Sequence, residues 1–102
     1  MPGYMYVWEY RVAPEHQDAF REAYGPAGAW VQLFRRAPGY LRSALYRDRL
    51  QPDRFLSIDY WESEADWQAF RSSYAAEFEA IDARCEELTK SEGEIGRFEP
   101  VE

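Results

Sequence analysis

The sequence is poor in the residues that build most metal and nucleophilic sites. It contains one cysteine and one histidine in 102 residues, Cys85 and His16, with no local cluster of acidic, His or Cys residues. No metal site is therefore predicted. A Ser or Cys hydrolase would need His16 as its base and a nucleophile in a strained turn, and no such turn is evident. Cys85 has no partner for an internal disulfide and is expected to be a buried structural thiol.

Basic clusters, glycine-rich phosphate loops and long apolar runs are also missing. The net charge of -7 is spread along the chain without a basic block, so nucleic acids and anionic membranes are poor partners. No apolar run approaches the length of a membrane span, and Met1-Pro2-Gly3-Tyr4 does not begin a secretion signal. These absences predict a cytoplasmic protein that binds neither membranes nor nucleic acids.

Aromatic residues are abundant instead. They make up 18% of the chain, and hydrophobic residues make up 46%. A chain of this length is expected to form one domain, residues 1–102, which is small enough to gain stability from a partner. The aromatic content predicts a packed core together with a ligand pocket or a subunit interface.

The most informative segment runs from residue 54 to residue 70. Residues 55–61 alternate as a strand does, which places Asp59 and Trp61 on the same face. Ser63 with Asp66 three residues later resembles a capping box, and Trp67 and Phe70 lie on one side of the helix that it begins. This segment predicts a strand that turns directly into a helix packed over the sheet.

The other elements follow from similar patterns. Tyr6, Trp8, Tyr10 and Val12 share one face of a first strand, and Gly25-Pro26 and Pro38-Gly39 interrupt the helices that follow it. The predicted elements are strand 5–12, a helix from residue 14 broken at 25–26, a helical piece over 30–37, strands 40–49 and 55–61 as a hairpin, helices from residue 63 and over 74–88, and strand 94–98.

This order predicts an α+β fold with a ferredoxin-like antiparallel sheet and helices on one face. The third strand nevertheless carries apolar residues on both faces: Leu56, Ile58 and Tyr60 on one, Phe55 and Trp61 on the other. Since the helices cover only one face, a second copy of the sheet is expected to cover the other. The sequence therefore predicts a homodimer.

Three short motifs suggest a family. Trp61-Glu62-Ser63-Glu64 closes a strand, Val12-Ala13-Pro14-Glu15 closes the first strand, and Pro38-Gly39-Tyr40 opens the second. Together they resemble the antibiotic biosynthesis monooxygenase family of dimeric α+β barrels, from about residue 6 to residue 98. That family includes quinol-forming monooxygenases and haem-degrading oxygenases, so the resemblance implies a dimeric barrel and an oxygenase activity.

The resemblance to the haem-degrading branch is incomplete. That branch has a tryptophan at the strand end, which Trp61 matches, but the place of its asparagine holds Trp8 and that of its iron-binding histidine holds Arg71. Guanidinium is always protonated and cannot replace imidazole as a ligand. Haem degradation is therefore the less favoured alternative.

The cofactor-independent branch needs no cofactor, because a deprotonated phenol, hydroquinone or anthrone can itself give an electron to dioxygen. For this chemistry Asp59 is the candidate proton acceptor, and Arg71 is the candidate group to stabilise the substrate anion or superoxide. Trp61 is the third candidate catalytic residue. The residues expected to line the pocket for a small aromatic molecule are Trp8, Tyr24, Trp30, Phe34 and Trp61.

Each candidate has a structural alternative, and these alternatives stay open at this point. Trp8, Trp30 and Phe34 also fit ordinary core positions. Asp59 also fits an ion pair with Arg42 or Arg47, and Arg71 a solvated charge at a helix end. At the level of the whole protein, the alternative is a non-catalytic dimeric domain that binds small molecules or acts in a stress response.

Overall fold

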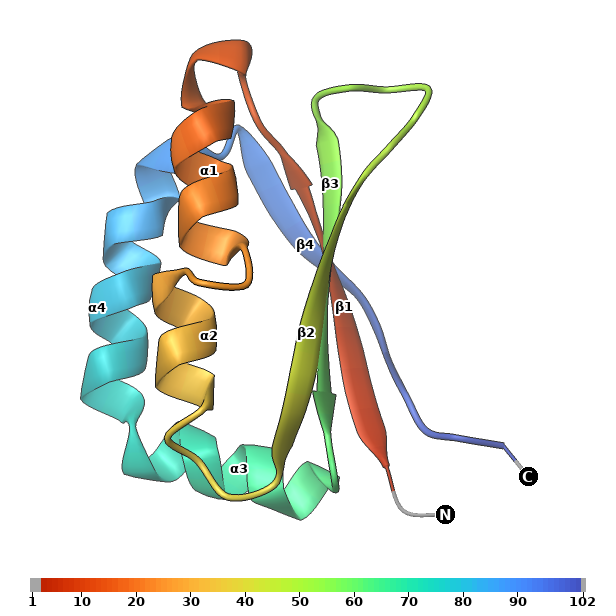
Figure 1. Ribbon diagram of the computed structural model, residues 1–102, viewed down its shortest axis with the longest axis vertical. Helices are drawn as coiled ribbons and strands as arrows, with labels where there is room; N and C mark the ends of the chain where they lie inside the picture. Colours follow the sequence, from red (N-terminus) through yellow and green to blue (C-terminus); the bar gives the residue numbers. More distant parts are fainter. Residues whose placement is uncertain (1–2, 102) are drawn as a thin grey trace.

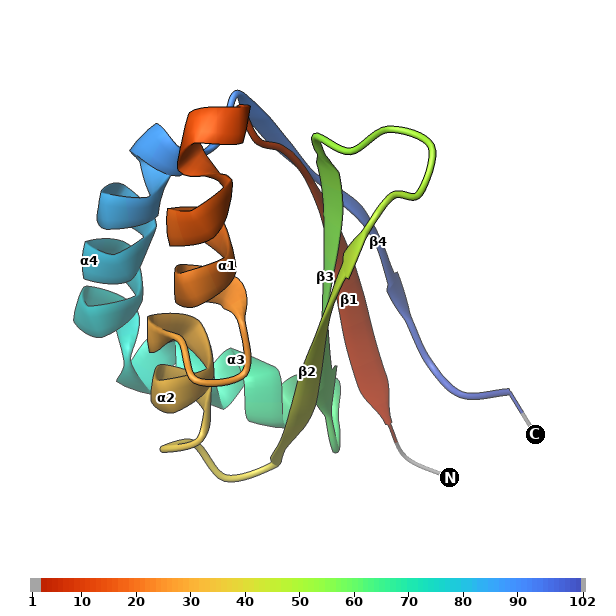
Figure 2. The same cartoon turned by 45° about the horizontal axis from the view of Figure 1, so that its top comes forward.

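The computed structural model describes residues 3–101 and forms one four-stranded antiparallel sheet with helices on a single face (Figure 1). The strand order is β2-β3-β1-β4, which is the ferredoxin-like arrangement that the sequence predicts. The view in Figure 2 shows the same two layers, with the far face of the sheet left open. The elements are β1 (Tyr4–Arg11), a 3-10 turn (Pro14–His16), α1 (Gln17–Tyr24), α2 (Ala29–Phe34), β2 (Tyr40–Arg47), β3 (Arg54–Trp61), α3 (Glu64–Ser73), α4 (Ala75–Cys85), a 3-10 turn (Glu86–Leu88) and β4 (Ser91–Phe98).

The predicted alternation along β3 is confirmed. Every second residue from Phe55 to Trp61 is buried under the helices, and the residues between them are only partly covered. β3 pairs with β1 on one side, where Tyr6 lies opposite Asp59, and with β2 on the other, where Ser43 lies opposite Asp59. Asp59 therefore lies near the middle of the sheet, on its covered face.

The predicted helix breaks are also confirmed, with small shifts at the ends. Ser63 caps α3 by accepting a hydrogen bond from the backbone N–H of Asp66, at 3.1 Å. α2 ends at Phe34, and α4 ends at Cys85 before a 3-10 turn. β4 begins at Ser91, three residues earlier than predicted, because Gly93 pairs with Glu9 instead of ending the strand.

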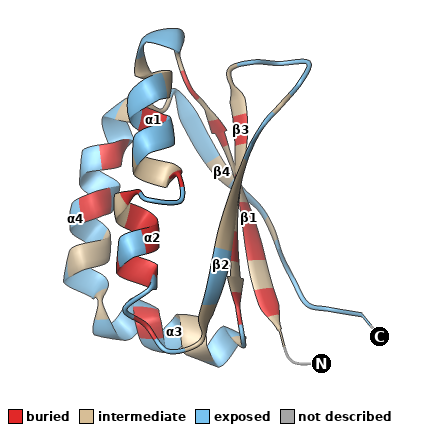
Figure 3. Cartoon of the chain, in the orientation of Figure 1, coloured by how far each residue is buried: buried red, intermediate tan, exposed pale blue. Residues whose placement is uncertain are grey.

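The core lies between the two layers and is strongly aromatic (Figure 3). One cluster gathers around Trp61, Phe34 and Phe70, and a smaller one around Phe20 and Phe55. Ring pairs connect the elements through edge and tilted contacts with centroids 4.9–6.2 Å apart, distances at which such pairs are favourable. Cys85 is buried in the larger cluster, as predicted.

The uncovered face of the sheet is apolar at its centre. Val7, Ala44 and Ile58 lie side by side in adjacent strands. Around them, Tyr46 is 58% exposed and Phe98 is 46% exposed. The second apolar face predicted from β3 is therefore present. Among the described residues, none of the helices has the length and apolar character needed to cross a membrane.

Gly39 should tolerate substitution poorly. It joins α2 to β2 with a φ of 87°, and an added Cβ would overlap the side chain of Asp66. We expect Gly39→Ala to lower the free energy of unfolding by about 1–3 kcal/mol. Urea denaturation checks this against Gly93→Ala, where an added Cβ meets no atom within 4 Å. Equal losses in the two variants would contradict the conformational explanation.

Candidate functional site

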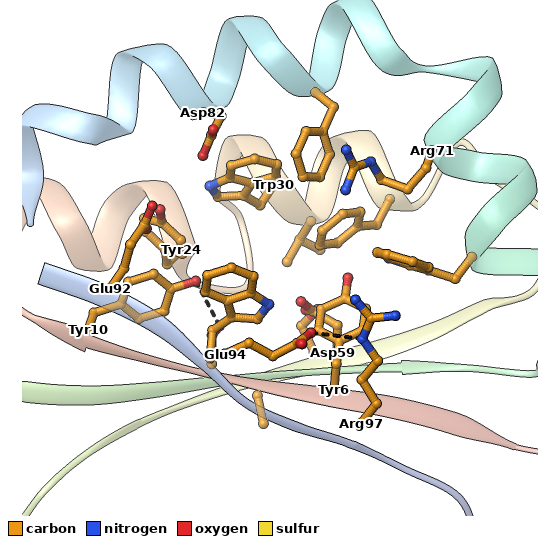
Figure 4. Close-up of a pocket in the computed structure, with 18 residues that line it drawn as sticks. Tyr6, Tyr10, Tyr24, Trp30, Asp59, Arg71, Asp82, Glu92, Glu94 and Arg97 are labelled. Atoms are coloured by element: carbon orange, nitrogen blue, oxygen red, sulfur yellow. Dashed lines mark hydrogen bonds and ion pairs between the residues drawn. The ribbon is translucent and has the colours of Figure 1, made fainter. Parts of the chain in front are cut away.

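A cavity of about 320 Å³ lies between the sheet and the helices (Figure 4). This volume is at the lower end of the range for small-molecule pockets. Its floor is formed by β1, β2 and β3, and its walls come from the helices and from the edge strand β4. The aromatic residues that line it are Tyr6, Trp8, Tyr10, Tyr24, Trp30, Phe34, Trp67 and Phe78.

Asp59 is the buried carboxylate of this cavity. Its residue is 8% exposed, and its Oδ1 accepts a hydrogen bond from the Ser43 hydroxyl at 2.5 Å. Burial raises the pKa of Asp59 to about 6, and the hydrogen bonds from Ser43 and Tyr6 act in the opposite direction. A carboxylate with this pKa is ionised at neutral pH, and it is a stronger base than an exposed carboxylate.

The alternative of an ion pair for Asp59 is not realised. Arg42 lies opposite Tyr60 in the sheet and places its guanidinium 4.0 Å from the centre of that ring, on the uncovered face. None of the ion pairs formed within residues 3–101 includes Asp59. Its negative charge is therefore offset by hydroxyl groups and not by an arginine.

Tyr6 lies beside Asp59 on the cavity floor (Figure 4). Burial raises the pKa of Tyr6 well above its ordinary value, and the charge of Asp59 raises it further. The indole N–H groups of Trp61 and Trp67 favour its ionised form, although neither forms a hydrogen bond of good geometry. Tyr6 therefore stays a neutral phenol next to the carboxylate.

Two tryptophans of the cavity lining have indole N–H groups without a partner among the described residues. Trp30 and Trp67 line the cavity from α2 and α3, and the indole nitrogen of each is buried without a hydrogen-bond partner in the described structure. A buried donor without a partner is destabilising unless a ligand or water satisfies it. Each of the two nitrogens has almost no accessible surface, so the rings line the cavity while the N–H groups lie behind them.

Charged residues surround the cavity towards α3, α4 and β4. Arg71 stacks on Phe78 with its guanidinium 4.0 Å from the ring centre, and Arg97 lies 5.4 Å from the centre of Trp67. Arg97 also forms an ion pair with Glu94 at 3.0 Å. Burial raises the pKa of Glu92, and nearby carboxylates raise it further. The cavity is thus bordered by arginines on one side and by acidic groups on another.

The structure brings six of the seven predicted site residues together. The predicted residues that line the cavity are Trp8, Tyr24, Trp30, Phe34, Asp59 and Arg71. Trp8, Trp30 and Phe34 also pack in the core, so both interpretations of these side chains hold.

Trp61 is the exception, and its predicted place in the cavity wall is wrong. Its side chain is 0% exposed and packs between Tyr40 and Phe70, with ring centroids 5.4 and 5.3 Å away. The neighbouring rings and the beginning of α3 cover it, so it does not reach the cavity. It belongs to the core that supports the site.

Several residues of the site were not predicted from sequence, and four of them bear on its chemistry. Ser43 and Tyr6 lie beside Asp59 across the sheet, and Trp67 and Arg97 border the cavity from α3 and β4. Tyr6 had a signal, because it shares a face with Trp8. Ser43 had none, because the strand pattern around it is irregular.

A haem or metal site finds little support in the side chains present. Within residues 3–101, no three His, Cys, Asp or Glu side chains are placed to hold a metal ion. The described cavity lining contains no histidine, cysteine or methionine, which are common protein ligands of haem iron.

Comparison with known proteins supports the same fold. The family model described as antibiotic biosynthesis monooxygenase matches residues 3–91. SnoaB from Streptomyces nogalater, a cofactor-independent oxygenase solved as a variant, is 19% identical with a TM-score of 0.68, covering 100% of this chain and 96% of that chain.

Two further solved structures belong to candidate antibiotic biosynthesis monooxygenases. The one from Deinococcus radiodurans is 20% identical with a TM-score of 0.74, covering 97% of this chain and 93% of that chain. The one from Bordetella bronchiseptica is 23% identical with a TM-score of 0.69, covering 100% of both chains. No curated protein matches the sequence. At these identities the solved structures establish the fold.

Proposed function

Because the chain belongs to the antibiotic biosynthesis monooxygenase family, we propose that it oxidises a small hydroxylated aromatic molecule with dioxygen and without a cofactor. The substrate class is a phenol, hydroquinone or anthrone. The observation that carries this proposal is Asp59, a buried carboxylate without an ion pair at the floor of an aromatic cavity. Its pKa of about 6 is suited to a general base.

In the proposed reaction, Asp59 accepts a proton from the substrate. The substrate anion then transfers one electron to dioxygen, and the substrate radical and superoxide combine to form a carbon–oxygen bond. The resulting peroxide anion takes the proton back from Asp59 to form a hydroperoxide. Loss of the C–H proton from the same carbon then breaks the oxygen–oxygen bond and leaves a carbonyl group, and this proton joins the departing hydroxide to give water. One oxygen atom enters the product and the other enters water, so the substrate supplies both electrons that the oxygen atom in water requires.

The other cavity residues have roles that follow from their chemistry. The aromatic walls, which include Trp8, Tyr24, Trp30 and Phe34, hold a flat ring system and exclude water. Arg71 stabilises the negative charge that develops on the substrate and on dioxygen.

We further propose that the active form is a homodimer joined through the uncovered face of the sheet. Val7, Ile58 and Ala44 form the apolar centre of that face, and partly exposed aromatic residues surround it. A second copy offers the same apolar surface in return, as an isologous interface requires.

Oxygen consumption tests the proposed activity. We expect the protein to accelerate oxygen uptake with some members of a panel of hydroquinones and anthrones, measured with an oxygen electrode in the presence of a chelator. The matched control is the dimethyl ether of each active hydroquinone, because it fits the same walls but has no hydroxyl proton to give to Asp59. The ethers should bind without oxygen uptake. Tight binding of the hydroxylated compounds with no uptake for any of them would leave only a binding function.

A further inference from the structure

We propose that Ser43 and Tyr40 are positioning residues of this site, forming a chain of hydroxyl groups that holds one oxygen of Asp59. This inference rests on the proposed function, because it concerns the same proton acceptor. Tyr40 does not line the cavity, so its part is indirect.

The hydrogen bonds show which hydroxyl group donates at each step from Tyr40 to Asp59. The Ser43 hydroxyl donates to Oδ1 of Asp59 at 2.5 Å, and the Tyr40 hydroxyl lies 2.7 Å from Oγ of Ser43. Since the Ser43 proton is already used on the carboxylate, Tyr40 must donate and Ser43 must accept. Such chains polarise one another, which strengthens the bond that reaches the charged group.

A β-bulge makes this arrangement possible. Tyr40 pairs with Trp61 and Ser43 pairs with Asp59, although Tyr40 and Ser43 are three residues apart. In a regular strand, two residues three positions apart point to opposite faces. The register shift between Tyr40 and Arg42 inserts an extra residue, so both side chains point to the covered face. Bulges of this kind commonly redirect side chains next to active sites.

Packing of the Tyr40 ring fixes the end of the hydroxyl chain that is farthest from Asp59. The Tyr40 ring lies against Phe34 and Trp61, with centroids 5.6 and 5.4 Å away. These contacts hold the ring while its hydroxyl reaches Ser43. Trp61 therefore contributes to the site through Tyr40, and not by contact with the substrate.

Other titratable groups around Asp59 do not replace this chain. From β1, the Tyr6 hydroxyl also lowers the pKa of Asp59, by less than Ser43 does. The remaining titratable groups of the cavity lining are Tyr10, Tyr24, Arg71, Asp82, Glu92, Glu94 and Arg97. None of these contributes a resolved change to the pKa of Asp59, whereas Ser43 gives the largest effect in favour of ionisation.

Carboxyl-carbon NMR titration and the pH dependence of oxygen uptake test the inference. In the wild-type protein both should show the midpoint of Asp59 at about 6. Ser43→Ala should move the midpoint to about pH 7, because a hydrogen bond to the ionised form is lost. Oxygen uptake at pH 6 should then fall about fivefold and recover above pH 8. Tyr40→Phe should give a smaller change in the same direction, and Ser43→Thr should restore the wild-type midpoint.

Ser57→Ala is the matched control, because Ser57 also lines the cavity but its hydroxyl bonds to Tyr10 at 3.2 Å. Its midpoint should stay at the wild-type value. Unchanged midpoints in Ser43→Ala and Tyr40→Phe, with oxygen uptake that still requires Asp59, would overturn the inference and leave the proposed function standing. Shifted midpoints with no oxygen uptake for any compound would support the hydroxyl chain and overturn the proposed function.

Discussion

Asp59→Asn should reduce oxygen uptake by a factor on the order of 100 to 10,000, which is the contribution typical of general base catalysis. The amide has nearly the shape of the carboxylate, and its oxygen still accepts the hydrogen bond from Ser43. It cannot take a proton from the substrate. Initial rates at saturating substrate check this, and they separate the loss of kcat from any change in binding.

The same substitution should stabilise the fold, which distinguishes loss of chemistry from loss of structure. Burial raises the pKa of Asp59 from 3.8 to about 6, so ionising this group in the folded protein is unfavourable. Its contribution to stability is greatest below pH 3.8 and falls as the pH rises to about 6. At pH 7.5, Asp59→Asn should therefore raise the free energy of unfolding by about 1–3 kcal/mol relative to the wild type. This gain should vanish near pH 4.

Asp53→Asn is the matched control for Asp59→Asn, because it makes the same substitution at a carboxylate outside the cavity. Hydrogen bonds and charges from Lys90 and Arg11 lower the pKa of Asp53, so its ionised form favours the folded state. The control should lose stability at neutral pH and keep its oxygen uptake, since Asp53 lies outside the cavity lining. A destabilised Asp59→Asn variant with normal turnover would contradict the role assigned to Asp59.

Ile58→Asp should convert the dimer into a monomer. Ile58 lies at the centre of the uncovered face, opposite Val7 on one side and Ala44 on the other. An aspartate there would bury one unpaired charge from each subunit in the interface, which disfavours association strongly. We expect the dissociation constant to rise by at least about 100-fold, equivalent to about 3 kcal/mol. Sedimentation velocity at micromolar concentration checks this.

Leu50→Asp is the control for this prediction. Leu50 is 90% exposed and follows β2, outside the strands that form the apolar face. Leu50→Asp introduces the same charge away from the proposed interface, so this variant should remain a dimer. A wild-type chain that sediments as a monomer at this concentration would overturn the proposed interface, and so would a dimeric Ile58→Asp protein.

The fold was predictable because the local signals agreed with one another. The alternation in β3, the Ser63 cap and the breaks at residues 25–26 and 38–39 all correspond to boundaries in the structure. The beginning of β4 was harder to predict, because Gly93 lowers the strand propensity of this segment. Pairing with β1 nevertheless keeps the segment in the sheet.

The candidate site was predictable only where one strand determined it. The phase of β3 correctly places Asp59 on the covered face, but the same phase led to the wrong position for Trp61, which other rings cover. Whether a side chain on the covered face meets a cavity or the core depends on the helices opposite. Tyr40 and Ser43 were missed because the bulge between them changes the face of one relative to the other.

Oxygen labelling tests the central claim most directly. With ¹⁸O₂ and an active hydroquinone or anthrone, the wild-type protein should give a product with one ¹⁸O atom at the new carbonyl, with the second atom recovered in water. Asp59→Asn, prepared and assayed in parallel, should give the label at the uncatalysed rate. A product whose new oxygen comes from water, or labelled product formed at the same rate by the two proteins, would contradict oxygenation by a substrate anion formed at Asp59.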